Sequence, residues 1–355
     1  MTNYLLAGGG TAGHVNPLLA LADQIMLQPG KHNVFALGTV EGLESRLVPE
    51  RGYQLLTVAR LPMPRKLNGY AFKFPVAFRN AVADVKRYIK NHKIDVVVGF
   101  GGYASAPAYR AALAMGIPYV IHEANALPGY ANRIGAKRAS AIAITFPNTK
   151  LVKGVLSGMP LRKEIVELIG NDSKKVATKF FNLDTKLTTL LVTGGSLGAK
   201  KINDTIEASR GVLDAAGIQV VHIVGDKAGL EPIHTGSYVR LNYCDRMDLA
   251  IAAADFAVAR AGAATVSEFT AVGLPAAFVP YPVGNGEQRL NAQQVVAAGG
   301  AVLVEDANFT PEYVRSELIP MVSNSKLRQQ MKDKALATGL GDGAERLLKL
   351  VNGVL

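Results

Sequence analysis

The chain has 355 residues, which suits two domains of ordinary size better than one continuous core. Hydrophobic residues make up 49% and charged residues 19%, which excludes the disordered and fibrous classes. The only cysteine, Cys244, excludes a disulfide framework and a cysteine-based zinc site and favours a reducing cytoplasm. The formal net charge of +11 favours a partner that carries phosphate groups, such as nucleic acid, an anionic lipid surface or a pyrophosphate substrate.

The first half of the chain predicts strands that alternate with helices. An apolar strand from Tyr4 runs into the turn at residues 8–10, and a helix follows near residues 17–27. The next predicted elements are a strand, a polar helix and two further strands, at residues 32–37, 42–48, 94–98 and 118–122. This alternation predicts a doubly wound parallel sheet, whose ligands bind at the carboxyl ends of the strands.

The second half repeats the pattern after a polar stretch that ends near residue 186. Its predicted strands are residues 188–193, 219–224, 238–241, 256–259, 276–280 and 301–304. We therefore predict an α/β protein of two domains, residues 1–158 and 159–337, with a terminal helix at about residues 338–355 that packs back on the first domain. The first residues lack a basic region and no window reaches about 18 uninterrupted apolar residues, which predicts a chain that is neither secreted nor membrane-spanning.

Most of the excess positive charge lies between residues 60 and 93, where nine lysines and arginines accompany one acid, Asp84. Helical periodicity is poor over residues 67–78. It returns at Phe78, where apolar residues at three-to-four spacing predict an amphipathic helix.

The motif Gly8-x-Gly10-x-x-Gly13 matches a dinucleotide fingerprint, because it follows a strand and opens a helix. The acidic residue that this fingerprint requires at the end of the second strand is missing, since only Glu41 follows at a distance. His14 stands in the same turn, either as a capping or packing residue or as a general base for a substrate hydroxyl.

Two stretches of the second half have alternative interpretations. The turn Gly194-x-Ser196-x-Gly198 matches the nucleophile elbow of hydrolases. It can also be interpreted as a phosphate-binding turn or as a structural turn without a ligand. Glu268, in the first turns of a predicted helix, either compensates the helix dipole or accepts hydrogen bonds from a ribose diol.

Taken together, several stretches resemble the MurG family of N-acetylglucosaminyltransferases and occur in the family's order across both domains. They are residues 8–14 (GGGTAGH), 99–107 (GFGGYASAP), 122–125 (HEAN), 194–199 (GGSLGA) and 262–268 (GAATVSE). The resemblance implies a GT-B fold, with two Rossmann-like domains facing across a cleft. It also implies inverting transfer of N-acetylglucosamine from UDP-N-acetylglucosamine to the 4-hydroxyl of lipid I, giving lipid II, with no cofactor and no metal held by the protein.

The resemblance assigns roles to matching positions. The first domain would serve the acceptor and the membrane, with His14 as candidate base and Tyr103 on the acceptor side. The second domain would bind the donor. The implied donor contacts are Thr11, Ala12, Gly13, Asn125, Arg162, Ser196, Cys244, Ala263, Ala264, Thr265, Val266, Ser267, Glu268 and Gln288.

Three positions depart from the family pattern. Ala12 replaces a glycine and fits only if its φ is negative. Glu287 replaces a glutamine, and Cys244 stands where an aliphatic residue lies near uracil.

In this setting the basic segment predicts association with an anionic membrane surface. The residues assigned to it are Phe72, Lys73, Phe74, Phe78 and Arg79. The expected location is the cytoplasmic side of the cell membrane, as a peripheral protein, with other cell-wall or division proteins as further partners and no nucleic acid. Two alternatives remain: another GT-B transferase with a lipid or natural-product acceptor, and an inactive scaffold that binds nucleotide sugars.

Overall fold

The computed structural model describes residues 1–64, 68–195, 198–226 and 228–355. The chain divides into two compact units. The first is Met1–Arg162 together with Asp342–Leu355, and the second is Lys163–Gly341. The boundary between the units therefore lies after Arg162. The sequence pattern predicted it slightly earlier, after residue 158.

The first unit is built on a seven-stranded sheet in the order β3-β2-β1-β4-β5-β6-β7, and all neighbouring strands are parallel. Its strands are β1 (Thr2–Ala7), β2 (His32–Gly38), β3 (Gln54–Thr57), β4 (Val96–Gly99), β5 (Tyr119–Glu123), β6 (Ala141–Ile144) and β7 (Gly154–Leu156). Its helices are α1 (Ala12–Met26), α2 (Glu44–Glu50), α3 (Gly69–Asn91), α4 (Ser105–Met115), α5 (Tyr130–Gly135) and α16 (Gly343–Asn352).

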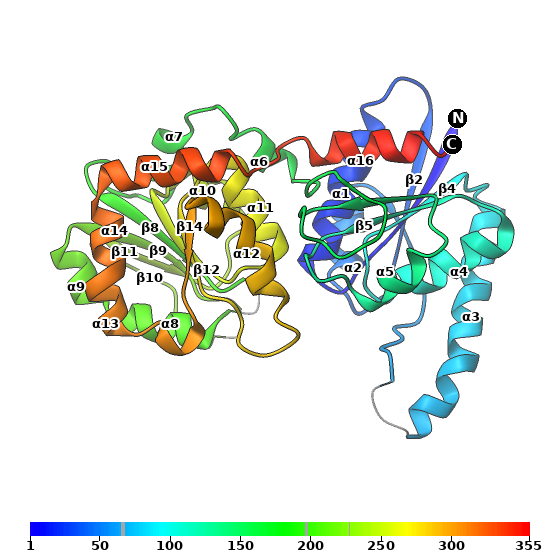
Figure 1. Cartoon of the computed structure of the whole chain (residues 1–355), viewed down its shortest axis with the longest axis horizontal. Helices are drawn as coiled ribbons and strands as arrows, with labels where there is room; N and C mark the ends of the chain where they lie inside the picture. The colour runs from blue at the N-terminus through cyan, green and yellow to red at the C-terminus, as the bar shows by residue number, and fades with distance from the viewer. Residues whose placement is uncertain (65–67, 196–197, 227) are drawn as a thin grey trace. The chain divides into compact units, whose positions relative to one another are not determined.

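Helices cover both faces of this sheet because successive strand residues point to opposite sides. Leu6 and Val98 pack in one buried cluster with residues of α1 and α16. Leu5 and Val97 pack in another with residues of α3 and α4. In Figure 1, α16 crosses the upper side of this unit and α3 extends below it. Parallel strands buried on both faces explain the nearly continuous apolar runs in the sequence.

The second unit has a seven-stranded sheet in the order β10-β11-β9-β8-β12-β13-β14, which is parallel except that β10 runs antiparallel to β11. Its strands are β8 (Thr188–Thr193), β9 (Ile218–Ile223), β10 (Ile233–Thr235), β11 (Tyr238–Leu241), β12 (Phe256–Ala259), β13 (Ala276–Phe278) and β14 (Ala301–Leu303). Its helices are α6 (Lys163–Val166), α7 (Lys174–Phe180), α8 (Lys200–Ala208), α9 (Arg210–Ala215), α10 (Met247–Ala253), α11 (Ala263–Val272), α12 (Glu287–Ala298), η1 (Asp306–Asn308), α13 (Pro311–Tyr313), η2 (Val314–Leu318), α14 (Ile319–Ser323) and α15 (Ser325–Leu336).

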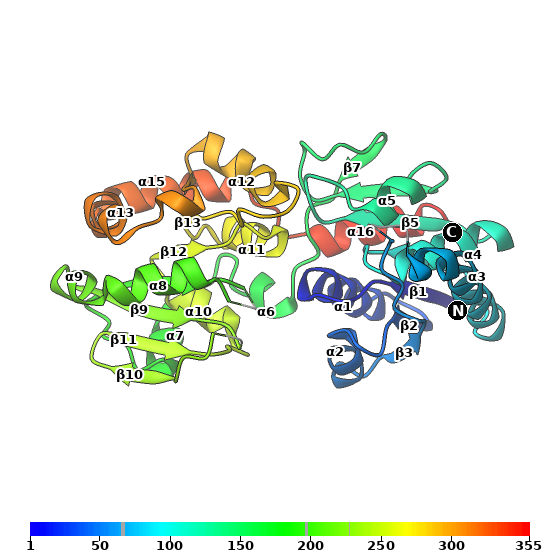
Figure 2. The same cartoon turned by 90° about the horizontal axis from the view of Figure 1, so that it is seen from below.

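A large apolar cluster covers one face of this second sheet. Leu190 and Val192 of β8 pack there against Ile202 and Ile206 of α8, and Leu318 joins the same cluster. Figure 2 shows α8 running alongside the strands of this sheet. The second unit is therefore a doubly wound domain like the first.

The ten strands predicted from the sequence are all present. Four further strands, β3, β6, β7 and β10, have only three or four residues each. Three of these, β3, β7 and β10, form outer edges of the sheets. These edge strands have at most one buried residue each, so they lack the buried apolar run that marks strands of similar length such as β4 and β12.

Two helices begin earlier than predicted. α1 starts at Ala12 rather than near Pro17, which lies inside it, so His14 is in the first helical turn. α3 starts at Gly69 rather than at Phe78, because the Asn68 side chain caps it by accepting a hydrogen bond from the Ala71 N–H at 3.1 Å. The prediction of a later start was wrong because the buried residues of α3 all lie in its second half, so its first half shows no helical periodicity.

Candidate functional site

Two glycine turns meet at the centre of the first sheet. β1 lies between β2 and β4, so the strand order reverses there, which is where doubly wound sheets bind ligands. Ala7 at the end of β1 pairs with Gly99 at the end of β4. The turns that follow, at residues 8–10 and 100–102, therefore start side by side.

These two turns are packed too closely to admit side chains. A methyl group on Gly102 would lie 2.6 Å from the Gly9 carbonyl oxygen, and one on Gly101 would lie 3.3 Å from Nε2 of His14. Both Gly101 and Gly102 have positive φ, which glycine adopts without strain. The Ser105 hydroxyl lies 2.7 Å from the Gly101 carbonyl oxygen and fixes the second turn.

His14 directs its ring at these turns from the first turn of α1. Its Nδ1 lies 3.1 Å from the Gly9 carbonyl oxygen and 3.3 Å from the Thr11 hydroxyl. Because a carbonyl can only accept, the bond to Gly9 assigns the proton to Nδ1 and leaves Nε2 able to accept one. Burial lowers the pKa of His14, while the Gly9 hydrogen bond and the charge of Glu44 act in the opposite direction. The ring is therefore neutral near pH 7, as a general base must be.

The other predicted residues of the first turn lie on the same edge of the sheet. Thr11 is the exposed, extended N-cap of α1, and Ala12 and Gly13 are its first two residues. Ala12 has helical, negative φ, so its methyl group fits where the family carries glycine. Tyr103 is half-buried just before α4, and the Arg60 guanidinium lies 5.2 Å from the centre of its ring.

Glu44, the first residue of α2, carries a fully buried carboxylate beside the same turn. Its Oε2 accepts a hydrogen bond from the Gly10 N–H at 2.7 Å. Its Oε1 accepts from the Thr39 N–H at 2.8 Å and the Thr39 hydroxyl at 3.0 Å. In a dinucleotide site a carboxylate binds the ribose and the N–H groups of the glycine turn bind the pyrophosphate. Here the Glu44 carboxylate and the Gly10 N–H are instead hydrogen-bonded to each other. This contact argues against the dinucleotide alternative.

The end of β5 brings a second buried carboxylate next to Asn125. Glu123 accepts hydrogen bonds from the Asn125 N–H at 2.9 Å, the Gly129 N–H at 3.0 Å and the Asn132 side chain at 2.9 Å. Burial raises the pKa of Glu123, and these hydrogen bonds act in the opposite direction. The contacts fix the loop that carries Asn125 at the edge of the sheet where His14 lies.

In the second unit the strand order reverses between β8 and β12. The turn after β8 is tightly packed, since a methyl group on Gly194 would overlap Ala199 and one on Gly198 would overlap the Val224 carbonyl. Ser196, the predicted diphosphate contact and the centre of the nucleophile-elbow alternative, lies outside the described residues. The described part of the turn leads directly into the N-terminus of α8, where backbone N–H groups favour an anion.

α11 begins at Ala263, directly after the carboxyl end of β12, with Gly262 as its N-cap. Of its predicted donor contacts, Ala264 and Thr265 are partly exposed, whereas the others are buried: Ala263, Val266, Ser267 and Glu268. Glu268 lies in the second turn, beyond the first-turn positions where an acidic side chain best compensates a helix dipole. This position favours the ribose interpretation over dipole compensation.

Three other predicted donor residues lie in loops or at a helix start. Gln288, the second residue of α12, accepts a hydrogen bond from the Tyr281 N–H at 2.9 Å. Cys244 is half-buried in the segment after β11. Arg162 is partly buried and is the last residue of the first unit before the chain passes to the second.

Sequence reasoning missed the residues that hold the site in shape. Glu44 and its partner Gly10 are 34 residues apart, and Arg260 forms an ion pair with Asp306 across 46 residues. Arg260 also donates to the Val279 carbonyl at 3.0 Å. No local motif marks such contacts, because they depend on which strands become neighbours.

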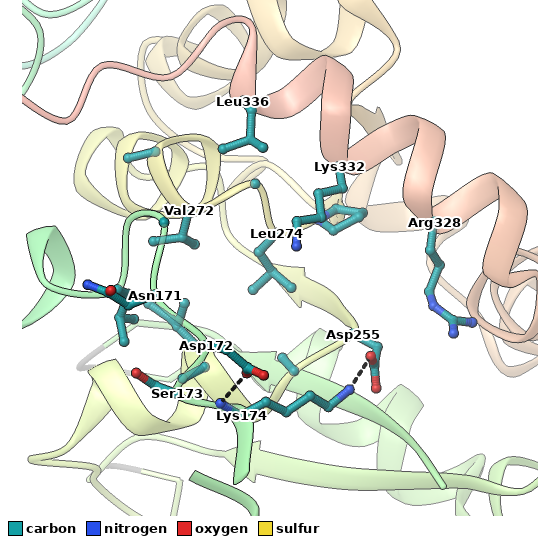
Figure 3. Close-up of a pocket in the computed structure, with 18 of the residues that line it drawn as sticks. Asn171, Asp172, Ser173, Lys174, Asp255, Val272, Leu274, Arg328, Lys332 and Leu336 are labelled. Carbon is teal, nitrogen blue, oxygen red and sulfur yellow. Dashed lines mark hydrogen bonds and ion pairs between the residues drawn. The ribbon is translucent and has the colours of Figure 1, made fainter. Parts of the chain in front are cut away.

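A cavity of about 610 Å³ lies at the end of the second sheet where strands β12 and β13 begin (Figure 3). Asp255 and Pro275, at the amino ends of β12 and β13, line it together with α15, from which Arg328 and Lys332 extend toward it. Lys174 forms an ion pair there with Asp255. The cavity is therefore on the edge opposite the glycine turns, and we assign it no part in donor binding.

The first half of α3 exposes apolar and basic side chains together. Phe72 is 77% exposed and Val76 60%, and Lys73 and Arg79 are exposed as well. Phe74 and Phe78 are half-buried and stack on each other, with ring centres 5.9 Å apart. In the part of the chain that the structure describes, no helix has the length and apolar character to cross a membrane, and no group of three His, Cys, Asp or Glu side chains is arranged to hold a metal ion.

Comparison with known proteins agrees with this architecture. Residues 4–144 match the glycosyltransferase family 28 N-terminal domain, and residues 189–347 match its C-terminal domain. The two Rossmann-like units thus define a glycosyltransferase of the GT-B fold.

The chain is 52% identical, over 352 residues, to the UDP-N-acetylglucosamine–N-acetylmuramyl-(pentapeptide) pyrophosphoryl-undecaprenol N-acetylglucosamine transferase of Clavibacter sepedonicus, covering 99% of this chain and 96% of that protein. It is 46% identical over 353 residues to the protein of the same name from Streptomyces coelicolor, covering 98% and 97%. The crystal structure of Acinetobacter baumannii MurG superposes with a TM-score of 0.77 at 27% identity, covering 99% of this chain and 100% of that one. The chain belongs to this MurG family of transferases.

Proposed function

We propose that this chain transfers N-acetylglucosamine from UDP-N-acetylglucosamine to the 4-hydroxyl of the N-acetylmuramoyl unit of lipid I, forming lipid II. The observation that carries this proposal is identity of about half the residues, over nearly the full length, with relatives named for that reaction. The site geometry supports it, because the first unit holds a neutral histidine whose Nε2 can accept a proton.

The reaction is a single displacement with inversion at the anomeric carbon. The acceptor oxygen forms a bond to that carbon as its proton passes to His14 Nε2, and the bond from the carbon to the diphosphate oxygen breaks to release UDP. The Nδ1 hydrogen bond to the Gly9 carbonyl holds the ring in the required tautomer and stabilises the imidazolium that forms. Tyr103 is proposed to contact the acceptor.

Donor binding is assigned mainly to the carboxyl edge of the second sheet. The N-termini of α8 and α11 offer backbone N–H groups and positive dipole ends to the diphosphate, which develops charge as it leaves. Glu268 is proposed to accept hydrogen bonds from the ribose. The other donor contacts are proposed on the family pattern: Thr11, Ala12, Gly13, Asn125, Arg162, Ser196, Cys244, Ala263, Ala264, Thr265, Val266, Ser267 and Gln288.

We further infer that the first half of α3 binds the cytoplasmic surface of the membrane, where lipid I is presented. Exposed Phe72 and Val76 supply apolar area, and Lys73 and Arg79 supply positive charge for anionic headgroups. This arrangement is the one expected of a peripheral protein that acts on a lipid-linked acceptor.

In the test, the protein is incubated with radiolabelled UDP-N-acetylglucosamine and either lipid I or diacylglycerol, and the label in each acceptor is measured. We expect label in lipid I alone. Label in diacylglycerol would instead favour another GT-B transferase. Donor binding without transfer to either acceptor would favour an inactive nucleotide-sugar scaffold.

A further inference from the structure

A single peptide group separates His14 from the buried carboxylate of Glu44. The N–H of the peptide between Gly9 and Gly10 donates to Glu44 Oε2 at 2.7 Å. The C=O of the same peptide accepts from His14 Nδ1 at 3.1 Å. In a trans peptide the N–H and C=O lie in the peptide plane and point in opposite directions, so the carboxylate and the imidazole are bonded at opposite edges of one rigid planar group.

The surroundings of Glu44 are built to hold its carboxylate in one place. Methyl groups on Gly9, Gly38 or Gly42 would each overlap its side chain, so three glycines form a close-fitting cradle. Glu44 is fully buried, and its other oxygen is held by the N–H and hydroxyl of Thr39. A buried carboxylate is costly unless its hydrogen bonds are satisfied, and these contacts satisfy them on both oxygens.

The arrangement has consequences for the histidine beyond its position. A carboxylate that accepts from the N–H of a peptide polarises that peptide and increases the negative charge on its carbonyl oxygen. A more negative Gly9 carbonyl accepts more strongly from His14 Nδ1, which favours the tautomer with an unprotonated Nε2 and stabilises the imidazolium. The carboxylate is therefore coupled to His14 through the shared peptide rather than by a direct hydrogen bond.

We propose that Glu44 is a positioning residue for transfer, and that its carboxylate fixes and polarises the Gly9–Gly10 peptide that holds His14 as a base. This proposal rests on the proposed function, because it concerns the same histidine. It extends that function by naming the group that orients the base.

The test is Glu44→Gln, which keeps the shape of the side chain but removes its charge and turns an N–H₂ group toward one of the present donors. We expect kcat to fall about 10- to 100-fold, with the donor KM changed by no more than about twofold. The acidic limb of the kcat profile should move to lower pH by about 0.5 to 1 unit, because His14 loses a nearby negative charge.

Two variants serve as controls. Glu50→Gln removes the same charge from an exposed position of the same helix, where Glu50 pairs with Arg46, and should leave kcat and the acidic limb unchanged. Glu44→Asp keeps the charge, and should restore the position of the acidic limb even where the shorter side chain lowers kcat. A Glu44→Gln enzyme with a wild-type acidic limb, or with only a raised donor KM, would overturn the proposal.

A second measurement does not depend on activity or on folding of the variants. Nitrogen chemical shifts of His14 in the wild-type protein report which ring nitrogen carries the proton. We expect a protonated Nδ1 and an unprotonated Nε2, and the opposite tautomer would overturn the proposal. Failure of His14→Ala to lower turnover would instead remove His14 as the base, so the failure of the proposed function and that of the Glu44 proposal are distinguishable.

Discussion

At the scale of single residues, the chemistry of the site depends on groups that the functional side chains touch. His14 stands beside glycines and a threonine in the sequence, yet its tautomer is set by the Gly9 carbonyl and its pKa by burial. For Glu268, the proposed role rests on its position in the second turn of α11 and on the burial of its side chain. Each residue leads to a prediction that separates catalysis from binding.

For His14 we expect His14→Ala to lower the rate of transfer by about 10²- to 10⁴-fold, the usual contribution of a general base. UDP-N-acetylglucosamine binding should stay within about threefold, because the ring is proposed to serve the acceptor hydroxyl rather than the donor. Steady-state kinetics and donor titration measure the two effects. His234→Ala, on the exposed strand β10, is the matched control and should change neither. Near-normal turnover of His14→Ala would remove His14 as the base.

For Glu268 we expect Glu268→Ala to raise the donor KM about 10- to 100-fold, the effect of losing hydrogen bonds to a charged group. Glu287→Gln removes a carboxylate from the first residue of α12, and its donor KM should stay within about twofold of wild type. Donor titrations of both variants decide the point. An unchanged KM in Glu268→Ala would place that carboxylate outside the ribose site.

At the scale of elements, α3 joins two segments with different surroundings. Its second half buries Ala81, Val85 and Ile89 against the sheet, whereas its first half packs little and exposes Phe72 and Val76. Exposed apolar side chains among lysines and arginines are typical of a surface that inserts into lipid headgroups. The helix is thus anchored at one end and presents the other to its surroundings.

For α3 we expect the double variant Phe72→Ser and Val76→Ser to weaken binding to vesicles that contain anionic lipid by about tenfold or more, since it removes the two apolar side chains proposed to insert among the headgroups. Wild-type binding should rise with anionic lipid content and fall with added salt. Sedimentation with vesicles measures both. Val152→Ser removes an apolar side chain that is exposed to 83% elsewhere in the same unit, and this variant should bind like wild type. Salt-insensitive binding would make the contact mainly hydrophobic.

At the scale of the whole molecule, the same architecture is used twice, and each unit buries a histidine in its core. His122 and His222 have no exposed surface. His122 lies 3.1 Å from the Gly158 carbonyl, and His222 lies between Tyr238 and Asn203. Burial lowers the pKa of each to about 4. Both rings are therefore neutral in the folded protein at neutral pH.

These two histidines predict how stability depends on pH. The unfolded chain, in which histidine titrates near pH 6.5, binds protons that the folded chain does not bind until about pH 4. Their contribution to stability is therefore complete above about pH 6.5 and is lost as the pH falls toward 4. We expect each of these two histidines to account for a loss of about 2 kcal/mol of unfolding free energy in its unit between pH 7 and pH 5.

Urea titrations, with hydrogen exchange to resolve the two units, measure this loss. His222→Gln should flatten the pH dependence of the second unit and leave that of the first unchanged. His234→Gln, at an exposed position, should change neither. A stability that stays constant from pH 7 to pH 5 would contradict the burial argument.

The sequence by itself determined the α/β class, the two series of buried strands and the glycine turns that end them, and the family resemblance was confirmed by full-length relatives. These features depend on local patterns: apolar runs, glycine spacing and helix starts. The predicted start of α3 was wrong because the first half of this helix buries no side chains in a core, so its apolar residues show no helical periodicity.

Only the tertiary structure decided which groups meet at the ends of the strands. The bond between Glu44 and the turn at Gly10 requires that α2 return to the edge of β1, and the meeting of that turn with Gly102 requires that β4 become the neighbour of β1. Such contacts follow from the order of strands in the sheet, which local periodicity does not encode. For that reason the sequence predicted His14 as the candidate base, while the structure alone revealed the peptide that holds its ring and the carboxylate bonded to that peptide.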